Sequence, residues 1–183
     1  SVQRMLARLP AGAQVFFEDA GYYNPGFHKL AVNTLMQRIT IFSLNEDELQ
    51  GHLGRTVDML DPAAVKAALE DLHKLIPSPV IVVHSMYWAL AYGDNARSMA
   101  NALRGGVTMA TTRFRYGDDF TVEHYRMVEN LPPNPEGAQF AAAIGDLLGR
   151  QVCVVPVAQV DQSNGTTIGL GDAFVGGFLP ALL

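Results

Sequence analysis

Short apolar runs alternate along this chain with longer stretches in which apolar residues recur every three or four positions. Four runs are typical of buried strands: residues 13–20, 39–44, 80–84 and 152–157. The helical spacing recurs at residues 2–9, 27–38, 45–56, 63–76, 95–104 and 136–149, and the small-residue segment 173–183 is also expected to be helical. Strands that alternate with helices predict an α/β fold, with a mainly parallel sheet covered by helices on both faces.

Local signals sharpen some boundaries and leave others open. Asp61 followed by Pro62 predicts a capped helix start, and the glycine pair 105–106 is expected to end the helix that begins at residue 95. Residues 107–112 fit either a strand or a loop. Arg113 and Arg115 then alternate as they do on a strand, which predicts two surface residues with one able to reach a phosphate.

Composition narrows the class of protein. The 183 residues suffice for one domain, residues 1–183, and a net charge of −5 argues against a general binder of nucleic acid or of membrane surfaces. No apolar run is long enough to cross a bilayer, and no signal peptide is visible. The single cysteine, Cys153, cannot form an internal disulfide, so a cytoplasmic location is expected.

The densest chemical signal is the glycine-rich stretch 164–178, which follows the last predicted strand and leads into the last predicted helix. A glycine turn at a helix start presents unpaired backbone N–H groups at the positive end of the helix dipole, where phosphates bind. Asp172 is unexpected beside a phosphate. It makes sense as a base that takes a proton from an attacking hydroxyl. The alternative is that Asp172 only caps the helix and the glycines serve close packing.

Residues 171–178, Gly-Asp-Ala-Phe-Val-Gly-Gly-Phe, resemble the C-terminal motif of the ribokinase superfamily of carbohydrate kinases. Leu170, where ribokinases usually carry Ala, makes Gly169–Asp172 more similar to the ADP-dependent glucokinases and phosphofructokinases. The resemblance implies that Asp172 is the catalytic base. It also implies that the N–H groups of Gly169, Leu170 and Gly171 form an anion hole for the transferring phosphoryl group.

Asn45 and Glu48 directly follow the second predicted strand. Their spacing predicts a capping box at a helix start, and the same residues resemble the superfamily's Asn-x-x-Glu motif, which implies water-mediated binding of Mg²⁺. Both roles can hold together. Glu46 and Asp47 are expected to be solvated acids of the first helical turn.

Glu18 and His84 also follow predicted strands. Residues 16–18 resemble the His-x-Glu element of the ADP-dependent branch, with Phe16 at the histidine position, so Glu18 alone carries over as a metal-ordering residue. The alternative is a solvated acid at a strand end, and Asp19 could substitute for Glu18. Residues 84–87 resemble a His-Thr-x-Tyr segment of the same branch, which implies that His84 contacts the ligand unless its role is structural. Asn164, Thr166 and Thr167 either line the nucleotide phosphates or shape the turn.

The order of these motifs resembles that of the family along nearly the whole chain. It implies the C-terminal part of a ribokinase-like large domain, whose N-terminal portion or a separate chain supplies the lid and the sugar contacts. The implied reaction transfers a phosphoryl group from ADP, or ATP, to a sugar or sugar-phosphate hydroxyl with Mg²⁺, and residues 1–183 alone are expected to be inactive. The alternatives are an ATP-dependent ribokinase-like kinase and a non-catalytic nucleotide- or sugar-binding protein.

Overall fold

In the part of the chain that the structure describes, five strands form a central sheet and lie in chain order. The computed structural model describes residues 2–20, 26, 30, 34–35, 38–161 and 165–182. The first three strands are parallel, and the fourth is antiparallel to both of its neighbours, so the fifth again runs in the direction of the first three. The strands are β1 (Phe16–Glu18), β2 (Ile41–Asn45), β3 (Val80–His84), β4 (Trp88–Gly93) and β5 (Val152–Pro156). The predicted strands and the mainly parallel sheet are confirmed, whereas β4 was not foreseen.

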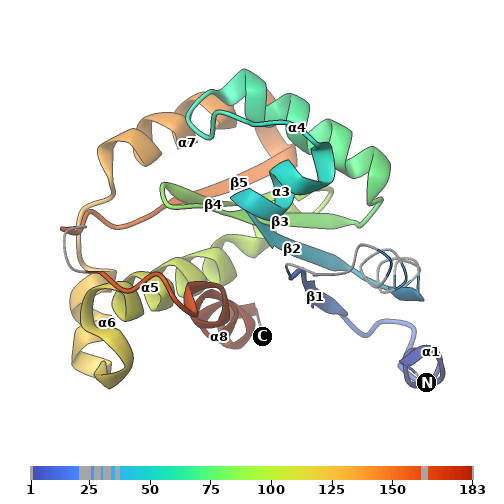
Figure 1. Ribbon diagram of the computed structural model, residues 1–183, viewed down its shortest axis with the longest axis horizontal. Coiled ribbons are helices and arrows are strands. Elements are labelled where there is room, and N and C mark those ends of the chain that lie inside the picture. Colours follow the sequence, from blue (N-terminus) through green and yellow to red (C-terminus); the bar gives the residue numbers. More distant parts are fainter. Residues whose placement is uncertain are drawn as a thin grey trace.

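Helices cover both faces of the sheet, which gives the expected three layers (Figure 1). On one face α3, α4 and α7 pack against Phe42, Ile81 and Leu90, and on the other α5 and α8 pack against Ile41 and Val82. Period-two alternation along each strand divides its side chains between the two cores. The helices are α1 (Val2–Leu6), α3 (Glu46–Leu53), α4 (Pro62–Leu75), α5 (Ala100–Tyr116), α6 (Val122–Glu129), α7 (Pro135–Leu148) and α8 (Leu170–Leu182). None of the described helices is long and apolar enough to cross a lipid bilayer.

Side-chain caps start the helices of the first face, and the predicted cap at Asp61 is confirmed. Asp61 accepts hydrogen bonds from Ala63 and Ala64 at the start of α4, and Asn134 caps α7 in the same way. Between these helices Trp88 is fully buried, with its ring stacked on Phe140 at 4.7 Å and its indole N–H bonded to a backbone carbonyl. The predicted helix at residues 27–38 lies largely outside the described residues.

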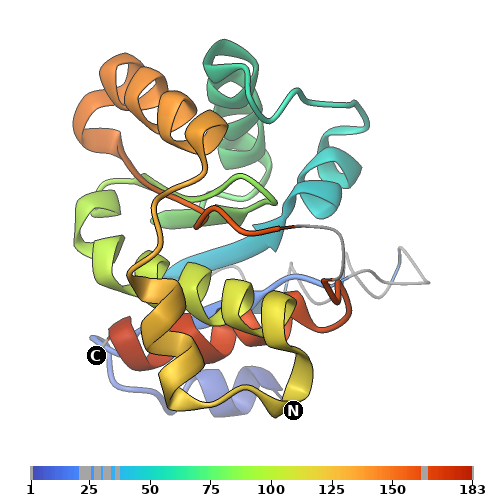
Figure 2. The ribbon, with the colours of Figure 1, turned by 90° about the vertical axis from the view of Figure 1, so that its left-hand side faces the viewer.

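The prediction for residues 95–116 is wrong in most of its detail. A short 3-10 turn over Ala96–Met99 leads into α5, which continues through Gly105 and Gly106 to Tyr116, so residues 107–112 are neither strand nor loop. A Cβ on Gly105 would meet the backbone of Gly177, and one on Gly106 would lie 2.6 Å from the ring of Phe174. These glycines therefore allow α5 to approach α8 closely rather than ending the helix. Figure 2 shows the two helices side by side beneath the sheet.

Because β1, β2, β3 and β5 run in one direction, their carboxyl ends meet at one edge of the sheet. Glu18, Asn45 and His84 are the last residues of their strands and therefore lie at this edge. Residues 157–161, which follow β5, and residues 165–169, which precede α8, lie at the same edge (Figure 1). This edge is where open α/β sheets generally bind ligands.

Candidate functional site

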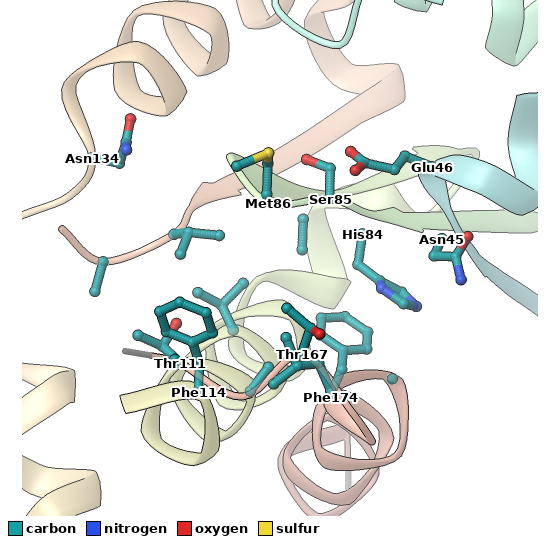
Figure 3. A pocket seen from close by; sticks show the side chains of 18 of the residues that line it. Asn45, Glu46, His84, Ser85, Met86, Thr111, Phe114, Asn134, Thr167 and Phe174 are labelled. Atoms are coloured by element: carbon teal, nitrogen blue, oxygen red, sulfur yellow. The ribbon is translucent and has the colours of Figure 1, made fainter. Parts of the chain in front are cut away.

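A pocket of about 600 Å³ opens at this edge, between the strand ends and the helices α5 and α8. Figure 3 shows the side chains of Asn45, Glu46 and His84 on its polar side, with Phe114 and Phe174 across from them. Apolar side chains from α5 (Val107, Ala110) and from the residues after β5 (Val157, Val160) line much of the remainder, together with polar residues such as Thr111 and Asn134. A cavity lined by apolar side chains with a few polar groups suits an organic ligand that also carries charge.

The start of α8 borders this pocket through Leu170 and Gly171. Gly169 has φ of 72°, a conformation that glycine adopts without strain, and its carbonyl accepts the first helical hydrogen bond from Ala173 at 3.0 Å. No described residue accepts a hydrogen bond from the N–H groups of residues 170–172. These groups are therefore unpaired among the described residues, and their binding of an anion stays a prediction. Asp172 lies in the first turn of α8, exposed and outside the lining of the pocket.

Glu18 and His84 form a pair at the sheet edge. The Nε2 atom of His84 lies 2.8 Å from Oε1 of Glu18, and the imidazole ring stacks on Phe174 of α8 at 4.5 Å. The second oxygen of Glu18, Oε2, is buried and has no hydrogen-bond partner among the described residues. The ring of Phe16, which occupies the histidine position of the implied motif, packs instead against Phe178 at 5.3 Å. An imidazole is thus bonded to Glu18 after all, but it comes from β3.

The expected capping box at Asn45 is present. The side-chain oxygen of Asn45 accepts from the N–H of Glu48 at 2.9 Å, and the Glu48 carboxylate accepts from the N–H of Asn45 at 2.9 Å. Burial of the half-buried carboxyl raises the pKa of Glu48, and the nearby Asp19 and Glu18 raise it further, while the hydrogen bond from Asn45 lowers it. The structural role of the pair is therefore established, and a role in metal binding has to share the same atoms.

Asp19 and Glu46 differ from what the sequence suggests for them. Asp19 is buried, and its Oδ2 lies 2.7 Å from Nε2 of His52, so it is engaged on the α3 side of the sheet rather than replacing Glu18. Glu46 is half-buried and lines the pocket, and so is not the solvated acid expected from its position in the first turn of α3. Burial raises the pKa of Glu46, as does the neighbouring Asp47, while a hydrogen bond from the backbone of Met86 lowers it.

Of the two predicted threonines, Thr167 lines the pocket and Thr166 does not. The backbone N–H of Thr166 bonds to the carbonyl of Phe114 at 3.2 Å. Asn164 lies outside the described residues. The bond from Thr166 joins the residues just before α8 to the end of α5, beside Phe114, which also lines the pocket.

Sequence reasoning missed the role of Arg113, because it placed this residue on a strand. Arg113 lies in the last turn of α5, and its Nε donates to the carbonyl of Ile168 at 3.1 Å, directly before Gly169. The sequence did contain a signal, since Gly106, Met109 and Arg113 follow helical spacing on the face that meets α8. Arg115, two residues on, is exposed and lies over the ring of Tyr116 at 5.2 Å.

The residues at the sheet edge fit a Mg²⁺ ion that is bound through water better than one enclosed by direct protein ligands. No group of three or more histidine, cysteine or carboxylate side chains among the described residues is placed to hold a metal ion. Mg²⁺, however, usually keeps several waters and takes one or two carboxylates together with substrate phosphates. The orphaned Oε2 of Glu18 is an anionic oxygen of the kind that such a hydrated ion requires. Asn45 and Glu48 contribute only as far as their capping bonds allow.

Comparison with solved structures gives the same fold. A phosphofructokinase from Pyrococcus horikoshii OT3 in complex with AMP matches with a TM-score of 0.73 and 20% sequence identity. A hypothetical ADP-dependent phosphofructokinase from the same organism matches with a TM-score of 0.70 and 22% identity. Each match covers 92% of this chain and 42% of the other. An ADP-dependent kinase in complex with fructose-6-phosphate and ADPβS matches with a TM-score of 0.66 and 15% identity, over 92% of this chain and 44% of that one.

No family model and no curated protein sequence matches the chain. The structural likeness therefore stands on the arrangement of the elements, and at these identities it shows the fold alone. This chain has the ribokinase-like fold of the ADP-dependent sugar kinases and spans less than half the length of the solved structures that it matches.

Proposed function

We propose that this chain is the nucleotide-binding and phosphoryl-transferring part of an ADP-dependent sugar kinase. The observation that carries the proposal is the start of α8, whose free N–H groups at residues 170–172 meet the pocket through Leu170 and Gly171. The apolar body of the pocket takes the nucleobase, and the helix start takes the phosphates. The AMP and ADPβS named for the matched kinases support an adenine nucleotide, and ADP as the donor.

Asp172 acts as the general base in this proposal. It follows the anion-binding turn directly and is exposed on the first turn of α8, so it can meet a sugar hydroxyl that approaches from outside the nucleotide pocket. It accepts the hydroxyl proton as the oxygen attacks the phosphorus, while the N–H groups of Gly169, Leu170 and Gly171 stabilise the charge on the transferring group. In such reactions the stabilisation of that charge generally accelerates the chemical step more than any other single effect.

Mg²⁺ is held through water by Glu18, Asn45 and Glu48 in this proposal, and it neutralises charge on the nucleotide phosphates. His84 keeps Glu18 in place through the 2.8 Å contact and lines the pocket through the same ring. Thr167, together with Thr166 and Asn164 of the preceding segment, contacts the nucleotide. The lid and the contacts that bind and position the sugar are contributed by a further portion of the protein or by a separate chain. We therefore expect residues 1–183 alone to bind nucleotide without phosphorylating sugar efficiently.

A pair of glycine variants on α8 tests the proposal. A Cβ at Gly171, which lines the pocket, and one at Gly176 would each meet no atom within 4 Å. The Cβ of a valine therefore has room at either site, but only at Gly171 does the added side chain lie at the pocket, beside the free N–H groups. In titration calorimetry with Mg²⁺, we expect the unaltered chain and Gly176→Val to bind ADP more tightly than ATP and Gly171→Val to bind neither. Equal ADP binding by both variants would remove the proposed phosphate site.

A non-catalytic nucleotide-binding protein remains the second candidate, and the replacement of the motif histidine by Phe16 favours it. The two candidates differ in turnover. A coupled assay of nucleotide consumption, run on the chain combined with the portion that supplies the sugar site, distinguishes them. ADP binding without turnover on any sugar or sugar phosphate would favour the binding protein.

A further inference from the structure

The guanidinium of Arg113 is held against the turn that precedes α8. Its Nε donates to the carbonyl of Ile168 at 3.1 Å, and its Nη1 lies 2.6 Å from the carboxylate of Asp118. A Cβ built on Gly169 would lie 3.1–3.3 Å from Nη2, Cζ and Nε of the same group. The guanidinium thus bonds to the turn through Nε, lies beside Gly169 through Nη2 and pairs with Asp118 through Nη1. The Arg113 side chain is only 25% exposed.

The bond to Ile168 controls the direction of a backbone N–H group. The peptide between Ile168 and Gly169 is planar, so its N–H points away from its carbonyl. With the carbonyl held toward Arg113, the N–H of Gly169 points to the opposite side of the peptide. If this peptide rotated by half a turn, the carbonyl oxygen would take the place of the N–H group. Its partial negative charge would then repel an approaching anion.

The backbone of Arg113 is held at a fixed distance from the turn by the packing of α5 against α8. Gly105 and Gly177 bring the backbones of α5 and α8 into contact, and Gly106 meets Phe174, so the spacing between the two helices is fixed below Arg113. Glycine at position 169 meets two demands at once, because its φ is 72° and the guanidinium fills the place of a side chain. A lysine would keep the charge without the planar set of donors.

We propose that Arg113 is a positioning residue for the anion-binding turn, which it holds in the orientation that directs the Gly169 N–H at a phosphate while adding a positive charge beside it. The inference rests on the proposed function, because it takes the phosphates of a nucleotide to bind at the start of α8. Asp118, which is 77% exposed, fixes the outer end of the guanidinium. Charge-assisted bonds of this kind are stronger than bonds between neutral groups.

The test compares Arg113→Met, Arg113→Lys and the control Arg115→Met, which removes the same charge from the same helix turn without touching the turn before α8. ADP and adenosine are titrated calorimetrically into each variant with Mg²⁺. For Arg113→Met we expect ADP affinity to fall about tenfold or more, from the loss of a charged contact, with adenosine affinity within about twofold. Arg113→Lys should lie between the original chain and Arg113→Met, and Arg115→Met should change neither affinity.

The NMR chemical shifts of the backbone amides of residues 169–172 provide a readout that does not depend on a ligand. Arg113→Met should displace them and Arg115→Met should not. The inference is overturned if Arg113→Met weakens ADP and adenosine equally, weakens neither, or leaves these amide shifts unchanged. If the unaltered chain binds neither ADP nor adenosine, the proposed function fails. The phosphate role of Arg113 then fails with it, and the amide shifts alone decide whether Arg113 holds the turn.

Discussion

Alanine at Gly176 and alanine at the adjacent Gly177 should change stability in opposite directions. Both residues lie within α8, where alanine is intrinsically favoured over glycine by about 0.5–1 kcal/mol. A Cβ at Gly176 would meet no atom within 4 Å. We therefore expect Gly176→Ala to raise the free energy of unfolding by about 0.5–1 kcal/mol.

At Gly177 the same methyl group has no room. It would overlap the carbonyl oxygen of Gly105 and lie 2.6 Å from the Cβ of Met109 and 2.7 Å from the carbonyl carbon of Gly105. The obstacle is the backbone of α5, which cannot swing aside as the end of a flexible side chain can. Overpacking of this kind costs about 1–3 kcal/mol, which exceeds the gain in helix propensity. We expect a net loss of about 1–2 kcal/mol for Gly177→Ala.

Urea unfolding at fixed pH, with the midpoint and slope determined for both variants, measures the two changes. Because Gly177→Ala pushes α8 away from α5, it should also weaken ADP binding, while Gly176→Ala should leave binding unchanged. If both variants are stabilised, α5 and α8 do not pack with their backbones in contact. Close approach of α8 would then not be the reason why α5 contains a glycine pair.

The remaining predictions concern single side chains. Asp172→Asn should alter stability by no more than about 0.3–1 kcal/mol, because it removes an exposed first-turn charge, while lowering kcat of the assembled kinase about 10²–10⁴-fold; near-normal turnover in a folded variant would contradict the role of a base. Trp88→Phe should cost about 1–3 kcal/mol in thermal or urea unfolding, because it leaves the carbonyl of Met59 buried without its donor, and a neutral result would mean that water reaches that carbonyl. Since burial raises the pKa of Glu46 in the folded state, the contribution of this side chain to stability is full below the pKa of an unfolded glutamate and is lost as pH rises through the folded value. Relative to the original chain, Glu46→Gln should therefore gain stability with rising pH across that window. A stability difference that does not change with pH would refute the raised pKa.

The sequence predicted most of the sheet because its strands are strongly apolar and bounded by clear breakers. The runs that contain Phe17, Phe42, Val82 and Val154 all form strands in the expected direction. The shared edge of Glu18, Asn45 and His84 followed from the parallel direction expected of strands that alternate with helices. The capping box was equally accessible, because it depends on residues only three positions apart.

The errors arose where tertiary contacts overrule local preference. Gly105 and Gly106 look like a helix end in isolation, and only the approach of α8 explains why the helix continues. The strand β4 is short, follows β3 after a tight turn, and carries Trp88 and Tyr92 within an alternation too brief to recognise. The pairing of Glu18 with His84 spans three strands and depends on register, which no local pattern specifies.

The order of the sheet has a consequence for how the protein folds. Every pair of neighbouring strands is also consecutive along the chain, so the sheet can grow by adding one strand at a time to the strand before it. The contact between α5 and α8, by contrast, joins residues 100–116 to residues 170–182 across a long loop, whose closure costs entropy. We therefore expect α8 to dock late, after the sheet has formed. A nucleotide bound at its N-terminus should then slow unfolding more than it speeds folding.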